Sequence, residues 1–308
     1  MLKKTEEYIA FGLVKLLVVI FALPPAGFSR RFLYVLLRVA LLFQPRYRRI
    51  AMTNIGIAFP DLDKRAREKI YTESCYALAR FLVDALRAPL LSREWMEDHV
   101  KFPAREELEK IKASGRPVLF ATGHLGSFEL MAHYYAKIGY SIHYVVRNFK
   151  NKALDKWWIE KRESSGNKVI NRKGAFKEMI KALKRGQDVG ALIDQNVTRN
   201  HAVFVDFFGL AAATTKAFAL AALREKPVIA VASMTCVADE NYIFNVEFLD
   251  FDELYERDDM TKGEKIFKIT SVVTKKFEEM IRNNPGEWLW FHRRWKTRPA
   301  GESENVYA

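Results

Sequence analysis

Apolar residues follow two different rhythms along the chain of 308 residues. In the first sixty residues they form two long runs, 8–23 and 32–43, broken only by Lys15 and Arg38. Over 64–87 they recur at helical spacing, and beyond residue 110 short apolar runs alternate with helical stretches. The change predicts a helical N-terminal section followed by a different, mixed architecture.

Strands and helices take turns in the second part. Strands are expected at 117–121, 141–146, 168–170, 188–193, 203–208, 227–233 and 242–248, the last as an edge strand. Helices are expected at 128–137, 154–164, 175–184, 214–224 and 261–282. This alternation predicts an α/β fold with a largely parallel central sheet flanked by helices. We divide the chain into N-terminal membrane-associating helices, 1–60, and an α/β catalytic domain, 61–308.

The N-terminal section carries positive charge only. Residues 8–60 contain no Asp or Glu, but they hold Lys15, Arg30, Arg31, Arg38, Arg46, Arg48 and Arg49. Apolar runs flanked by arginine suit an anionic leaflet. The first run is shorter than the roughly 20 residues that cross a bilayer comfortably. A shallow anchor, one tilted span and an ordinary pair of core helices all remain open, and we expect membrane association.

Composition narrows the partners without choosing one. The net charge of +13 favours a polyanion: nucleic acid, an anionic membrane or an acidic carrier protein. No RNA-recognition signature, zinc finger, P-loop or GxGxxG is present. The two cysteines, Cys75 and Cys236, form no CxxC, which argues against a disulfide framework or zinc cluster.

The segment PVLFATGHLGSFEL, 117–130, holds the most informative chemistry. An apolar strand leads into His124, and a helix follows with Glu129 in its first turn. Residues five apart on one straight helix point about 140° apart, so the two can meet only if His124 lies in the loop. A histidine held by a carboxylate is a good general base and needs no enzyme-bound intermediate. The alternatives are a hydrogen-bonded loop histidine and a carboxylate that complements the helix dipole.

Further polar residues follow later strands. Arg162, Arg172 and Lys173 could bind phosphate or carboxylate groups, and Asp194 could orient one of the arginines. Solvated helix faces and a turn aspartate are the alternatives. His133 has no further matched metal ligands, so we expect neither a metal nor another cofactor.

HxxxxE after a buried strand resembles the lysophospholipid acyltransferase superfamily. The rest of the chain resembles its lipid A biosynthesis branch, the late lauroyl or myristoyl acyltransferases. The resemblance rests on RRIAMTNIGIAFPD (48–61), KRESSGNKVINRKGAFKEMIKALKRG (161–186), ALIDQN (191–196), VFVDFFGLAAATT (203–215) and GEWLWFHRRWKTRP (286–299). Members often have Asn-Trp before the glutamate, where this chain has Ser127-Phe128, which indicates a changed pocket lining.

The resemblance implies that His124 is the base, Glu129 its partner, and Arg162 and Asp194 are functional. It implies acyl transfer from acyl carrier protein to a hydroxyl of a Kdo-bearing lipid A precursor, an anionic lipid, at the cytoplasmic face of a bacterial inner membrane. Nucleic acid is not expected as a partner. The alternatives are acylation of another lipid, such as a lysophospholipid or glycolipid, and a non-enzymatic basic protein that binds membrane or nucleic acid.

Overall fold

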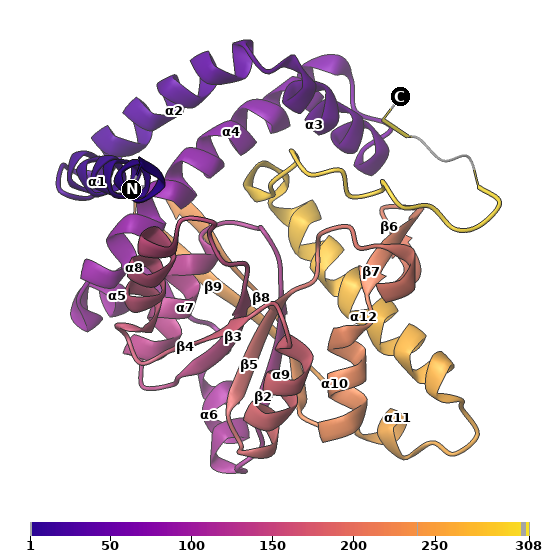
Figure 1. Ribbon diagram of the computed structural model, residues 1–308. Coiled ribbons are helices and arrows are strands. Elements are labelled where there is room, and N and C mark those ends of the chain that lie inside the picture. The colour runs from indigo at the N-terminus through magenta and orange to yellow at the C-terminus, as the bar shows by residue number, and fades with distance from the viewer. Residues whose placement is uncertain (1, 239, 303–305, 308) are drawn as a thin grey trace.

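The computed structural model describes residues 2–238, 240–302 and 306–307, without the side chains of residues 2–10 and 13. Its N-terminal helices are α1 (Leu2–Ala22), α2 (Ala26–Leu42), α3 (Pro45–Ala58) and α4 (Lys64–Arg87). They arch over one end of the sheet (Figure 1). Asp63 caps α4 by accepting a hydrogen bond from the Ala66 N–H at 2.7 Å, the usual role of aspartate before a helix. The expected helix 64–87 is confirmed to the residue.

The central sheet has the strand order β1-β9-β8-β2-β5-β3-β4. Its strands are β1 (Val100–Lys101), β2 (Val118–Thr122), β3 (Ile142–Val146), β4 (Lys168–Asn171), β5 (Asp188–Leu192), β8 (Val228–Ala238) and β9 (Asn241–Leu249). From β8 to β4 all neighbours are parallel, whereas β9 and its parallel neighbour β1 run in the opposite direction. The expected α/β fold with a mostly parallel sheet is therefore confirmed, and the carboxyl ends of β2, β5, β3 and β4 share one edge.

A layer of helices covers each face of the sheet, and β2 is therefore buried on both faces. Val118 and Phe120 point toward α7, whereas Leu119 and Ala121 join the core under α9, α10 and α12. The helices after α4 are α5 (Arg93–His99), α6 (Arg105–Ala113), α7 (Phe128–Lys137), α8 (Lys152–Glu163), α9 (Ala175–Lys184), α10 (Ala217–Glu225), α11 (Asp252–Glu256) and α12 (Lys262–Asn283). The short 3-10 turns are η1 (Ala88–Leu90), η2 (Arg199–His201) and η3 (Pro285–Glu287).

Two expectations need correction. A helix was expected from residue 214, but β6 (Ala202–Phe207) and β7 (Leu210–Thr215) form an antiparallel hairpin, and α10 begins only at Ala217. The expected helix took in Thr214 and Thr215, which pair with Val203 and Ala202 of β6 instead, and their β-branched side chains suit a strand. The strand expected at the edge of the sheet, β9, is covered on its outer side by the two residues of β1.

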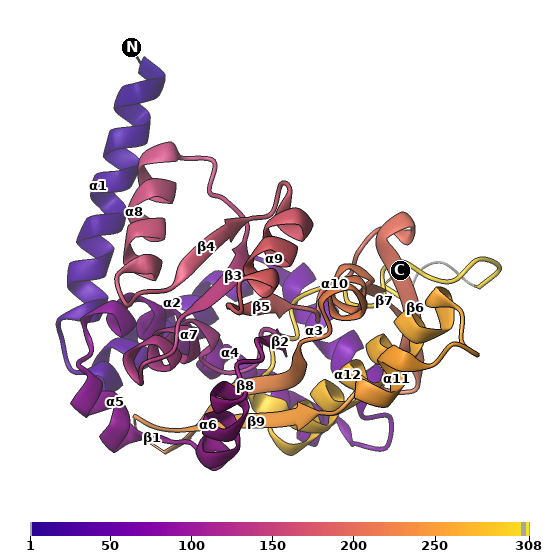
Figure 2. The same cartoon turned by 90° about the horizontal axis from the view of Figure 1, so that it is seen from below.

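The first helix lies partly beside the body of the protein. Figure 2 shows α1 running along α8 and projecting past the sheet, and Phe11 packs edge-on against Trp157 with 6.3 Å between ring centroids. None of the helices in the described ranges is long and apolar enough to cross a membrane. Residues 50–58 share a core with the C-terminal tryptophans, and the boundary at residue 60 stays a prediction.

Candidate active site

The loop between β2 and α7 carries His124, and a glycine sets its path. At Gly126 the backbone has φ +64°, and an added Cβ would lie 1.9 Å from the Met234 carbonyl oxygen of β8. Glycine alone tolerates both conditions. The Ser127 N–H donates to that same carbonyl at 2.8 Å. The loop is therefore pinned to β8, and His124 sits at the carboxyl edge of the sheet as predicted.

Asp194, which directly follows β5, holds His124. Its Oδ1 lies 3.0 Å from His124 Nδ1, and its Oδ2 accepts the His124 backbone N–H at 2.8 Å. The indole N–H of Trp288 donates to the same Oδ2 at 2.9 Å. Since β2 and β5 are neighbours, their carboxyl ends bring these residues together. A carboxylate can only accept here, so Nδ1 carries the proton and Nε2 keeps a lone pair.

The electrostatics of the pair favour an imidazolium beside a carboxylate. Burial lowers the pKa of His124, but the charge of Asp194 and their hydrogen bond outweigh it, so the net pKa is raised. Glu129 adds a smaller raising effect. Burial alone would raise the pKa of Asp194, yet the charge of His124 and the hydrogen bonds from His124 and Trp288 bring it to about 2. Asp194 is therefore ionised throughout the physiological range.

The free face of His124 is partly open. Its side chain is 21% exposed, and the amide nitrogen of Gln195 lies 3.2 Å from Nε2. With Nδ1–H bound to Asp194, the Gln195 amide donates to the Nε2 lone pair. A substrate hydroxyl that displaced this exposed amide would meet the same lone pair.

Glu129 has a different partner from the one expected. It lies in the first turn of α7, as predicted, and both of its oxygens accept from Arg162 Nε at 3.1 Å, with a further bond from Nη2. Both side chains are mostly buried, and the Arg162 guanidinium lies over Trp158. The structure thus corrects the expected pairing. Asp194 orients His124 rather than an arginine, and Arg162 spends its Nε edge on Glu129. Burial lowers the pKa of Arg162, but Glu129 keeps it raised overall.

Arg172 and Lys173 stand apart from this cluster. Both are exposed in the loop after β4, at the same sheet edge. Three strand spacings separate β4 from β2 in the sheet, about 14 Å at the usual distance between strands. They can therefore meet only a large substrate that also reaches His124, and their binding role stays a prediction.

An apolar crevice opens beside His124. Its walls come from α4, from the loop before α7 and from the C-terminal segment, and they include Leu78, Phe81, Phe128 and Leu289. Phe128 stacks on Phe81 at 4.4 Å and meets the His124 ring edge-on at 5.2 Å. The crevice holds only about 30 Å³, about the volume of one water molecule. A larger groove of about 490 Å³ lies against another face of the same stretch of α4, where Tyr34, Thr72, Glu73 and Tyr76 line it, and Glu287 borders both openings.

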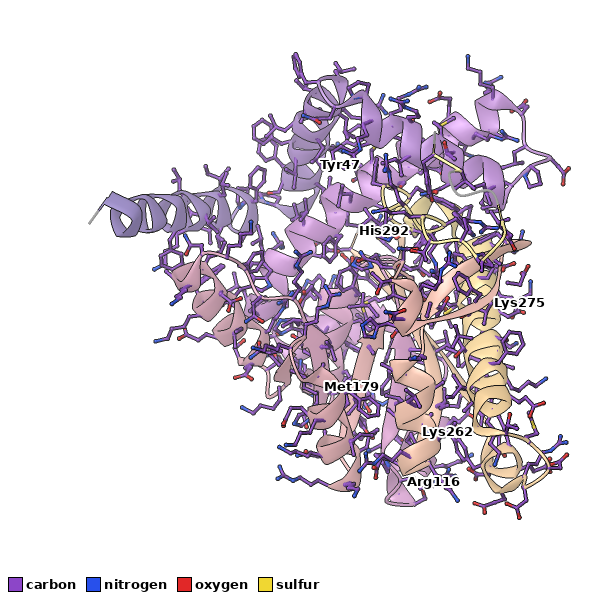
Figure 3. The ribbon with its side chains drawn as sticks, turned by 45° about the vertical axis from the view of Figure 1, so that its right-hand side comes forward. Tyr47, Arg116, Met179, Lys262, Lys275 and His292 are labelled. Carbon is purple, nitrogen blue, oxygen red and sulfur yellow. The ribbon has the colours of Figure 1, made fainter. Side chains whose placement is uncertain are left out.

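The C-terminal segment completes the site. The Leu289 N–H donates to the His124 carbonyl oxygen at 3.0 Å, and His292 Nε2 accepts the Asn196 N–H at 2.9 Å. Figure 3 places His292 below the N-terminal helices, well away from Arg116 at the other end. Neither the contact of Trp288 with Asp194 nor that of Gln195 with His124 was predicted. Their distance along the chain hides both contacts, although WLW and DQN are visible motifs.

No group of three His, Cys, Asp or Glu side chains in the described ranges could hold a metal ion. His133, which lies four residues after Glu129, instead has its Nδ1 2.5 Å from Ser165 Oγ. Burial lowers the pKa of His133 to about 4, so this ring is neutral at physiological pH.

The amino-acid sequence is similar to those of one family of known proteins. The family model described as bacterial lipid A biosynthesis acyltransferase matches residues 1–297. The lipid A biosynthesis palmitoleoyltransferase of Escherichia coli K12 is 26% identical over 85% of this chain and 82% of its own length. The myristoyltransferase of the same strain is 25% identical over 91% and 85%. Its lauroyltransferase is 25% identical over 86% and 84%.

Proposed function

The chain belongs to the bacterial lipid A biosynthesis acyltransferases, which makes it an O-acyltransferase, and we propose that it moves a fatty acyl chain from acyl carrier protein to a hydroxyl of a Kdo-bearing lipid A precursor. The observation that carries the proposal is the oriented histidine. His124 turns Nε2 toward the mouth of an apolar crevice while Asp194 holds its other nitrogen, so in the neutral ring Nε2 carries the lone pair.

In the proposed reaction the acceptor hydroxyl replaces the Gln195 amide at His124 Nε2. The histidine takes the hydroxyl proton while the oxygen attacks the thioester carbonyl carbon. The tetrahedral intermediate collapses, the C–S bond breaks, and the imidazolium returns the proton to the leaving thiolate. Asp194 stabilises the imidazolium between these steps without taking its proton. No acyl-enzyme forms, because the nucleophile is the acceptor itself.

Glu129 and Arg162 support the same step from a second position. The charge of Glu129 raises the pKa of His124, which stabilises the imidazolium. Arg162 fixes that carboxylate through two donor groups on one edge of its guanidinium, the geometry that arginine offers to carboxylates. We therefore retain Glu129 as a catalytic residue, acting beside the His124–Asp194 pair.

The acyl chain is placed in the crevice beside His124. The larger groove shares α4 with this crevice but lies across Glu287, whose side chain is ion-paired with Arg80, so the two spaces are separate in the structure. Because the crevice is small, it must widen when the chain binds. The Phe128 ring borders His124 and would contact the chain close to its reactive carbonyl. The crevice walls include Leu78, Phe81, Phe128 and Leu289, which are aliphatic and aromatic, as acyl binding requires.

We further propose that α1 and α2 rest on the cytoplasmic face of the bacterial inner membrane. Most exposed large hydrophobic side chains in the described residues lie between Leu16 and Phe43. Phe28 is 63% exposed and Val35 is 55% exposed on the outer side of α2. Exposed arginines at positions 31, 46 and 49 accompany them, which suits anionic headgroups.

The loops at the carboxyl edge supply positive charge toward the site. Arg147, Lys150, Arg172 and Lys173 are all exposed after β3 and β4. An acidic carrier protein and a phosphorylated acceptor would both be attracted there. Arg172 and Lys173 are our choice for contacts with the charged parts of these substrates, outside the reacting centre.

The test is acyl transfer by protein purified in detergent, with acyl carrier thioester and Kdo-bearing lipid A precursor. Product is expected from the wild type and from His201→Ala, which alters an exposed histidine. His124→Ala should lose at least about 10³-fold in kcat, because the base is removed. Product formation undiminished in His124→Ala would refute the mechanism.

The same assay separates the alternatives. A lysophospholipid or a glycolipid offered beside the lipid A precursor competes for the same base, and mass spectrometry of the products identifies the acceptor. Acylation of the competitor alone would retain the chemistry and replace the substrate. Steep salt-dependent binding to nucleic acid without any acyl transfer would favour the non-enzymatic alternative.

A further inference from the structure

A buried polar network lies behind the active-site loop. The Asp84 carboxylate of α4 stands at its centre. Oδ1 accepts from Arg30 Nη2 at 2.6 Å, and Oδ2 accepts from Ser127 Oγ at 2.5 Å and from the Tyr242 hydroxyl at 2.8 Å. The four residues come from α2, α4, the loop before α7 and β9, and none is more than 3% exposed.

Ser127 occupies the N-cap position of α7, but its side chain does not cap the helix. A serine directly before a helix normally accepts a hydrogen bond from the first turn. In the described structure Ser127 makes no such cap on α7 and donates to Asp84 instead. Its backbone N–H is bound to β8, so the hydroxyl is the second fixed point of this residue. Ser127 lies between His124 and Glu129 in the chain. Holding Ser127 in place therefore also fixes the position of His124 relative to Glu129.

The same helix holds the loop at another point. Arg80, one turn before Asp84, forms a buried ion pair with Glu287. The backbone carbonyl of Glu287 accepts the Gly126 N–H at 3.0 Å. Two consecutive loop residues, Gly126 and Ser127, are thus tied to α4 through two charged side chains. Moving a charged side chain out of water is unfavourable unless the charge is paired, and these paired charges lie directly behind the loop.

We propose that Asp84 and Ser127 are positioning residues of the acyl transfer, with Arg30 as the ion-pair partner that holds the Asp84 side chain in place. The inference rests on the proposed function. Arg30 comes from the inner side of α2, whose outer side carries Phe28 and Phe32. The Asp84 carboxylate therefore links the position of α2 to the position of the active-site loop. A small shift of a reacting group is enough to lower a rate strongly.

The test compares two variants that each remove one hydroxyl from Asp84. Ser127→Ala should lower kcat about tenfold with KM unchanged, because the loop drifts while the binding surfaces stay. Tyr242→Phe removes a donor to the same oxygen and an acceptor of Arg30 Nη2, and it does not touch the loop. Because Arg30 keeps its bond to Asp84 Oδ1, kcat should stay near the wild-type value. Hydrogen exchange of the amides of residues 123–130 should quicken in Ser127→Ala alone.

The outcomes separate the two proposals. Wild-type protein without acyl transfer defeats the proposed function, and exchange still decides whether Ser127 holds the loop. Active wild type with equal kcat in both variants, or unchanged exchange in Ser127→Ala, overturns the positioning role. An equal loss of thermal stability in both variants with unchanged kcat would reduce Ser127 to a structural residue.

Discussion

The two carboxylates of the site have exchanged the partners that the motif suggests. The HxxxxE motif suggests Glu129 as the partner of His124. Instead, Nδ1 of His124 is bound to Asp194, which lies seventy residues later in the chain. The pairing could not be foreseen, because it depends on strand order. Once β5 is known to neighbour β2, a residue directly after β5 must lie beside the loop after β2. The position of His124 in the loop was predictable from the sequence around it, and the identity of its closest partner was not.

The pH dependence of catalysis follows from this pair. The base acts only when neutral, and the pKa of His124 is raised above the ordinary histidine value, so kcat/KM should fall as pH drops through that raised pKa. Asp194→Asn removes the charge that stabilises the imidazolium, which lowers the pKa and moves the acid limb to lower pH. The amide can also donate to Nδ1 and reverse the tautomer, so the maximal rate should drop by about 10³- to 10⁴-fold.

The pH profile of kcat/KM measures both effects. Asp206→Asn, an exposed aspartate in β6, is the matched control and should keep the wild-type profile. An acid limb that stays in place in Asp194→Asn but moves in Glu129→Gln would show that Glu129 is the residue that controls the base.

Some helices and strands could be predicted from the sequence, and others could not. β2 and α7 were predictable because a short apolar run gives way, across two glycines, to helical spacing. β7 was not, because the three alanines of LAAATT suit a helix better than a strand, and the segment becomes a strand by pairing with β6. The same holds for β1, whose two residues are a strand only because β9 lies beside them.

The outer side of α2 offers a test of membrane docking. Val35→Asp places a charge on the exposed face of that helix and should weaken binding to anionic vesicles at least about tenfold, through lost apolar burial and repulsion. Phe267→Asp, on α12, is matched in exposure, 51% against 55%, and should bind like the wild type. Neither change should alter the melting temperature, because both positions face solvent.

Vesicle co-sedimentation at equal protein concentration gives the answer. A similar loss of binding in both variants would point to a general effect of charge, and no loss in either would remove α2 from the proposed membrane face.

The molecule as a whole is basic, and we predict that its excess charge contributes to binding of the proposed acidic carrier. With a net charge of +13, attraction to an acidic carrier should be screened by salt. Raising NaCl from about 50 to about 500 mM should increase KM for the carrier-linked donor several-fold and change kcat little. The uncharged acyl-pantetheine thioester, which presents the same reacting group, should keep its KM. Equal salt effects on both donors would exclude carrier recognition by charge.

The contact of Trp288 and Leu289 with the histidine loop also governs when the enzyme first becomes active. Translation runs from the N-terminus, so α1 and α2 leave the ribosome long before these residues are made. A nascent chain can therefore contain His124 and Asp194 while the indole donor to Asp194 and the backbone tie to His124 are still missing. The helices that we propose to dock are available first, and acyl transfer competence arrives last. The order of synthesis thus makes the helices that we propose to dock available before the histidine loop gains its C-terminal contacts.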